Sequence, residues 1–185
     1  PSHGTVSIVN DKATYVPNTN FYGTDSFVVM VSDNHPTQPK ATTALVTVNV
    51  DAVNDVPLLD ALSDTTISED AAEQTVSLTG IATGASEDQP LRVTATSDNA
   101  GLLPDPTVTY TSPNATGSIA FTPVADEHGS ATITVTVEDG GLDQNLATSE
   151  DNATVSQTFT VTVVSVMDRP VLDTTASPQL VPVIE

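Results

Sequence analysis

The stretch "ATITVTVED", residues 131–139, alternates apolar and polar side chains without interruption. Ile133, Val135 and Val137 fall on one side of an extended chain, and the threonines between them fall on the other. Strict alternation of β-branched residues is typical of a strand with one buried and one solvent-facing side. The stretch therefore predicts a β-sheet that covers a hydrophobic core with one of its faces.

Similar runs rich in valine and threonine fill most of the chain: "GTVSIV", "ATYV", "SFVVMVS", "TALVTVNV", "RVTATS", "TVTYT", "SIAFT" and "TFTVTVVSV". Clusters of Gly, Pro, Asn and Asp separate these runs, and no stretch keeps the 3.6-residue period of an amphipathic helix. Short strands joined by such turns predict an all-β protein with Greek-key sandwich architecture.

Two stretches of the chain repeat one another. "PNTNFYGTDSFVVMVSDN" begins at Pro17 and "PVADEHGSATITVTVEDG" begins at Pro123. In both, a glycine stands six residues after the proline and an aspartate stands sixteen residues after it. This spacing indicates an internal structural repeat.

Related endings mark the seams of this repeat. "VNVDAVNDVPLLD", residues 48–60, and "VVSVMDRPVLD", residues 163–173, each follow a valine-rich strand with an acidic residue and a proline. One period from seam to seam predicts a complete module at residues 57–170. Residues 1–56 then hold the last four strands of a preceding module, and residues 171–185 open a following module or form a linker.

The complete module contains seven expected strands. They lie near Thr65–Ser68, Thr75–Leu78, Leu91–Ser97, Thr107–Thr111, Gly117–Thr122, Ser130–Glu138 and Thr154–Val166. The four strands of residues 1–56 form only half of a sandwich, so we expect one apolar face of that half to be uncovered.

The chain is strongly acidic, with 24 Asp and Glu against 4 Lys and Arg among 185 residues and a formal net charge of −20. This charge opposes binding to nucleic acid or insertion into an anionic membrane, and it favours a cation as partner. Acidity that only keeps a protein soluble is the alternative explanation. The absence of cysteine excludes disulfides, cysteine zinc sites and a thiol nucleophile.

The positions of the acidic residues favour a metal site over a merely soluble surface. Successive strands of a sandwich end at opposite poles, so two groups of oxygen ligands are expected. The pole that faces residues 1–56 should carry Asn54, Asp55, Glu87, Asp88 and Asp139, and the opposite pole should carry Glu69, Asp126 and Asp168. Oxygen-rich clusters suit Ca²⁺, whereas Mg²⁺ prefers stricter octahedral geometry and soft metals prefer Cys or clustered His.

The sequence resembles the cadherin-like tandem repeats of large bacterial extracellular proteins. The similarity is carried by "HGTVSIVNDKATYVPNTNFYGTDSFVVMVSD" and by "VNDVP", which is similar to the cadherin linker pattern Asp-x-Asn-Asp-Asn. The resemblance implies Greek-key seven-stranded cadherin/Ig-like β-sandwich repeats in tandem, with Ca²⁺ shared between neighbours. By the same resemblance the metal ligands are Asn54, Asp55, Glu69, Asp88, Asp126 and Asp139.

The sequence also departs from the cadherin pattern. Ala52 replaces the first linker aspartate and Val56 the last asparagine, and "ADEH" stands where the family has Asp-Arg-Glu. One or two ions per junction are therefore expected in place of three.

The function that follows is a calcium-binding structural or adhesion module of a large bacterial surface protein, not an enzyme. His3, His35 and His128 are far apart in sequence, and none belongs to a serine nucleophile motif. The expected partners are neighbouring repeats of the same chain, with homophilic, cell-surface and glycan partners left open. The alternative is a carbohydrate-binding module of a secreted glycan-degrading enzyme, although the chain has no tryptophan to stack on sugars.

Overall fold

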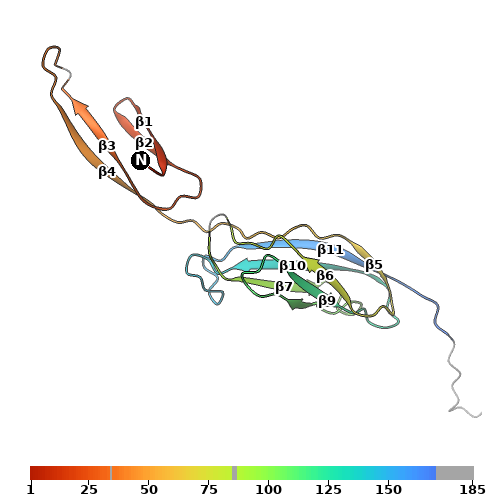
Figure 1. Ribbon diagram of the computed structural model, residues 1–185. Coiled ribbons are helices and arrows are strands. Elements are labelled where there is room, and N and C mark those ends of the chain that lie inside the picture. The colour runs from red at the N-terminus through yellow and green to blue at the C-terminus, as the bar shows by residue number, and fades with distance from the viewer. Residues whose placement is uncertain (34, 85–86, 170–185) are drawn as a thin grey trace, which may run out of the picture.

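The computed structural model describes residues 1–33, 35–84 and 87–169, and the strands in this part of the chain form an all-β structure (Figure 1). The strands are β1 Gly4–Val9, β2 Lys12–Pro17, β3 Gly23–Ser32, β4 Ala41–Val50, β5 Thr65–Ser68, β6 Gln74–Leu78, β7 Leu91–Ser97, β8 Thr107–Thr109, β9 Gly117–Phe121, β10 Gly129–Asp139 and β11 Thr154–Val164. No helix that could cross a membrane is found among the described residues. The expected continuation at residues 171–185 lies outside them.

The seven strands β5 to β11 form a two-layer sandwich. One sheet has the order β5-β11-β10-β7 and the other has the order β6-β9-β8. β5 pairs with β11 in parallel, and the remaining pairs are antiparallel. Each of the seven expected strands is present, and the Ig-like β-sandwich fold class is confirmed.

The alternation of residues 131–139 determines which face of β10 is buried. Ile133, Val135 and Val137 are fully buried in the core between the two sheets. On the outer face Thr134 lies between Thr96 of β7 and Thr158 of β11 in register. The two sheets meet through apolar side chains, including the ring pair of Phe121 and Phe159, whose centroids are 6.4 Å apart. Burial of this face supplies the main driving force for the sandwich.

Residues 1–50 form two hairpins, β1–β2 and β3–β4, which correspond to β8–β9 and β10–β11 of the sandwich. The two hairpins meet at Tyr15 and Phe27, whose rings are stacked with centroids 6.3 Å apart. Val31 is 65% exposed, whereas Val137, at the aligned position of β10, is 0% exposed. The apolar side chains near Val31 are therefore uncovered, because the described part of residues 1–50 contains no counterparts of β5, β6 and β7.

A buried aspartate stabilises this half-module. Asp25 on β3 accepts hydrogen bonds from the backbone N–H groups of Ser2 (3.1 Å), His3 (2.9 Å) and Ser26 (2.8 Å), and from the Tyr15 hydroxyl (2.9 Å). Burial by itself raises the pKa of Asp25, but the hydrogen bonds outweigh burial and lower that pKa below its ordinary value. The ionised carboxylate thus connects the chain start, β2 and β3.

An extended linker joins the two parts. It leaves β4 at Val50, and Pro57 is already buried at the edge of the sandwich. Leu58 and Ala82 then form an isolated antiparallel bridge. In Figure 1 the two hairpins lie beyond one end of the sandwich, and the chain leaves the sandwich at its opposite end. The sandwich therefore has two poles: we call the one next to the linker the linker pole and the other the far pole.

Candidate cation sites at the two poles

Asn54 fixes the linker to the linker pole. Its Nδ2 donates hydrogen bonds to Asp139 Oδ1 (3.0 Å) and to the backbone carbonyl of Asp151 (2.8 Å). Its Oδ1 accepts a hydrogen bond from Gln89 Nε2 (2.8 Å). All three hydrogen bonds reach residues of the sandwich. The side-chain amide of Asn54 therefore connects the linker to the loop after β6, to the end of β10 and to the loop that follows β10.

Asp139 ends β10 and is fully buried. Besides Asn54, its Oδ1 accepts hydrogen bonds from the backbone N–H groups of Gly141 (3.0 Å) and Ala153 (2.8 Å). Its other oxygen, Oδ2, is buried and has no hydrogen-bond partner in the structure of the described residues. A buried carboxylate oxygen without a partner is costly, and a cation or a donor at that point would remove the cost.

Asp55 and Glu87 bring two further carboxylates to the same pole. The backbone N–H of Asp55 lies 3.2 Å from both carboxylate oxygens of Glu87. The linker also packs closely on Gly84, where an added Cβ would collide with Cβ of Asp55. Desolvation raises the pKa of Glu87, and the negative charges of Asp55 and Asp139 raise it further against the lowering effect of the Asp55 N–H. The linker pole therefore brings the negative charges of Asp55, Glu87 and Asp139 close together.

Asp88, which was expected at this pole, is exposed, and its neighbours Glu87 and Gln89 make the contacts to the linker. Sequence reasoning missed Gln89. The signal that could have found it is its place beside Glu87 and Asp88 in the same loop, because an amide side chain also supplies an oxygen ligand.

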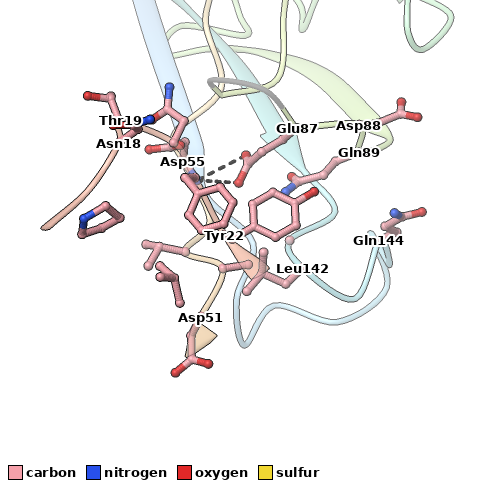
Figure 2. Close-up of a pocket in the computed structure, with 17 residues that line it drawn as sticks. Asn18, Thr19, Tyr22, Asp51, Asp55, Glu87, Asp88, Gln89, Leu142 and Gln144 are labelled. Carbon is pink, nitrogen blue, oxygen red and sulfur yellow. Dashed lines mark hydrogen bonds between the residues drawn. The ribbon is translucent and has the colours of Figure 1, made fainter. Parts of the chain in front are cut away.

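A cavity of about 550 Å³ opens between the hairpins and the sandwich at the linker pole (Figure 2). Its walls come from the loop after β2, the linker, and the loops after β6 and β10 of the sandwich. The lining residues include Phe21, Tyr22, Val53, Glu87, Gln89 and Leu142. Figure 2 shows Tyr22 between Gln89 and Leu142, with the carboxylate of Glu87 close by. We call this space the seam cavity.

The far pole gathers four carboxylates: Glu69, Asp70, Asp126 and Asp168. Desolvation and the negative charges of Asp70, Asp126 and Glu69 raise the pKa of Asp168 above its usual value. Glu69 is 4% exposed, and its Oε1 accepts a hydrogen bond from the Val166 N–H (2.8 Å). The three residues that sequence reasoning placed at this pole therefore lie near one another, and Asp70 joins them.

One histidine lies beside the far-pole carboxylates. His128 Nδ1 is 3.7 Å from Glu69 Oε2, and the His128 side chain is 65% exposed. The arginine nearest in sequence to this group, Arg169, follows Asp168 directly and forms no ion pair within the described part of the chain. Carboxylates close together with little compensating charge repel one another unless a cation intervenes.

Neither pole is a preformed metal cage. Within residues 1–33, 35–84 and 87–169, no group of three His, Asp or Glu side chains is arranged so that it could hold an ion by itself. Binding would therefore require rotation of carboxylates or added oxygens from amides, the backbone or water. The donor set at both poles consists of oxygen atoms, which fits Ca²⁺ with its flexible shell of six to eight oxygens.

Comparison with known proteins bears on the family and the fold. Residues 1–50 match a protein-family model described as a bacterial Ig domain. No curated protein matches the chain.

Among solved structures, an endo-fucoidan hydrolase of glycoside hydrolase family 107 is similar with 18% identity and a TM-score of 0.37, over 90% of this chain and 23% of that one. Domains 4 and 5 of the S-layer protein SbsC are similar with 15% identity and a TM-score of 0.38, over 85% of this chain and 90% of that one. The chain thus spans about a quarter of the hydrolase. Over residues 1–50 the chain is similar to a bacterial Ig domain, and the sandwich that follows contains strands that correspond to those of residues 1–50 within a seven-stranded form.

Proposed function

We propose that this chain is a non-catalytic spacer or adhesion module of a bacterial extracellular protein, and that Ca²⁺ stiffens its junctions. The observation that carries the proposal is the fully buried Asp139, whose Oδ2 lacks a partner among the described residues while Glu87 and Asp55 lie at the same pole. The crowding of Asp168 by three other carboxylates supports the same conclusion at the far pole.

The mechanism is electrostatic. Without a cation, like charges at each seam repel and destabilise the ordered junction. A divalent cation bound only to the folded arrangement neutralises them and adds stability by mass action. Extracellular calcium modules bind with dissociation constants of roughly 10⁻⁴ to 10⁻³ M, so the junctions would stiffen at the calcium levels of an external medium.

The residues at the two poles would contribute different oxygens. At the far pole Glu69, Asp126 and Asp168 supply carboxylates from three separate segments, so an ion there would join the sandwich to the chain that follows. At the linker pole, Asp139 Oδ2 and the Asp55 carboxylate are the available ligands, and Asn54 would have to turn its Oδ1 inward. Asp88 points away from this group and contributes only from an exposed position.

The test compares the whole chain in calcium with the chain in excess chelator. We expect calcium to raise the melting temperature, and small-angle scattering to report a longer and narrower particle. Magnesium at the same concentration should do less, because its coordination is stricter. The double variant Asp126→Asn, Asp168→Asn should lose the part of the response that arises at the far pole, and Asp11→Asn, at an exposed hairpin turn, should keep the whole response. Superimposed melting curves in calcium and chelator would end the proposal.

The carbohydrate-binding alternative has one observation in its favour: Tyr22 is 59% exposed and lines the seam cavity together with amide side chains. A single tyrosine is a small platform for a sugar ring. Binding of a neutral oligosaccharide that is lost in Tyr22→Ala would favour this alternative over a spacer.

A further inference from the structure

The seam cavity is too large to be explained by a metal ion alone. Its volume is about 550 Å³, which is in the range of pockets for organic ligands. Phe21 and Tyr22 line one side and Leu142 the other, and Tyr22 and Leu142 remain 59% and 47% exposed. Asp139, the residue best suited to calcium, is not part of the cavity wall. Asp55 and Glu87, in contrast, line the cavity and also lie at the linker pole, so the cavity adjoins the proposed calcium site and shares these two carboxylates with it.

The charged groups among the lining residues are all carboxylates, and the other polar side chains are amides and hydroxyls that both donate and accept hydrogen bonds. Glu87, Asp55, Asp51 and Asp88 contribute carboxylates, and the lining residues include no Lys, Arg or His. Gln89 is 6% exposed, and its Oε1 has no partner among the described residues. A buried acceptor of this kind points to a ligand that donates hydrogen bonds.

We propose that the seam cavity binds the side chain of a lysine or arginine on a basic partner polypeptide. An ammonium or guanidinium group donates hydrogen bonds and accepts none, so it matches Gln89 Oε1 and the Glu87 carboxylate. Its methylene stem packs on Leu142 and Val53, and its charge lies against the ring of Tyr22. The net charge of −20 steers such a partner toward the module from a distance.

The test uses the whole chain in excess chelator, so that its result does not depend on calcium. Nα-acetyl-lysine methylamide and Nα-acetyl-arginine methylamide are titrated in, with Nα-acetyl-norleucine methylamide as the neutral control of matching length. NMR of the Gln89 side-chain amide and the Tyr22 ring reports occupancy. We expect shifts with both cationic probes and none with the neutral one.

Variants separate a specific site from general attraction to an acidic protein. Glu87→Gln and Tyr22→Ala should each weaken binding of the lysine probe by about fivefold or more, in line with the loss of one charged or cation–π contact. Asp11→Asn removes the same charge as Glu87→Gln, but far from the cavity, and should change affinity less than twofold. Equal weakening by Glu87→Gln and Asp11→Asn would overturn the proposal.

Two further outcomes would also overturn it. One is an equal shift with the norleucine probe, which would make the cavity merely apolar. The other is a shift of Gln89 and Tyr22 with calcium or a neutral oligosaccharide but with neither cationic probe.

Discussion

Asn54 of the linker donates a hydrogen bond across 3.0 Å to Oδ1 of Asp139, a fully buried residue 85 positions later in the chain. This contact ties the chain between two modules to the end of the central strand β10. Hydrogen bonds between protein groups thus order the linker pole without an ion. An ion at this pole would add to that arrangement and would not create it.

Asn54→Ala should destabilise the sandwich by about 1–3 kcal/mol, because it removes a donor from a buried carboxylate and leaves Gln89 Nε2 without its acceptor. Urea unfolding followed by circular dichroism measures the change. Asn114→Ala, at an exposed turn, serves as the control and should stay within about 0.5 kcal/mol of the original chain. A cost for Asn54→Ala no greater than for this control would show that the amide contacts add nothing to stability.

Asp139→Ala and Asp139→Asn should behave differently. The alanine variant removes the acceptor of one Asn54 side-chain N–H and of the backbone N–H groups of Gly141 and Ala153, and should cost about 3 kcal/mol or more. The asparagine variant keeps an acceptor oxygen and replaces the unpartnered oxygen by an amide nitrogen, so it should cost less. It should also remove the part of the calcium response that arises at the linker pole. Calorimetry with calcium and with chelator distinguishes the two effects, and an unchanged response in Asp139→Asn would exclude Oδ2 as a ligand.

Glu87→Gln should stabilise the chain at neutral pH. The pKa of Glu87 is raised in the folded chain, so the ionised group lowers stability above its folded pKa. This penalty fades as the pH falls and is gone below the unfolded pKa. The gain from Glu87→Gln should therefore be largest near pH 7 and should vanish in acid, which unfolding curves at several pH values would reveal. A gain that does not change with pH would contradict the electrostatic explanation.

Tyr15→Phe should show the opposite pH dependence. The pKa of Asp25 is lowered in the folded chain, so the ionised carboxylate contributes stability above its unfolded pKa and loses it as the pH falls toward the folded value. Removing the Tyr15 hydroxyl takes away one of the hydrogen bonds that hold this pKa down. The variant should be less stable at neutral pH, and its deficit should shrink in acid. Fluorescence of the remaining tyrosines reports the unfolding, with Tyr22→Phe as the matched exposed control.

Much of the fold was predictable from local sequence. Alternation of β-branched and polar residues determines which face of a strand is buried, and it located all seven strands of the sandwich to within a few residues. The repeat spacing identified Pro17 with Pro123, and with them the corresponding hairpins. These features depend on neighbours along the chain, which is why a single sequence is enough to find them.

The tertiary structure decided what the acidic positions do. Asp33 and Asp139 occupy the same place in the repeat, yet Asp33 is exposed and accepts hydrogen bonds from His35 and Lys40 of its own loop, whereas Asp139 is buried against the linker. Likewise Gln89, which sequence reasoning overlooked, holds Asn54 while Asp88 faces away from it. Burial and hydrogen-bond partners come from segments that are distant in sequence. The sequence therefore indicated which loops are rich in oxygen ligands. Only the packing of these loops determined which oxygen atoms lack a hydrogen-bond partner.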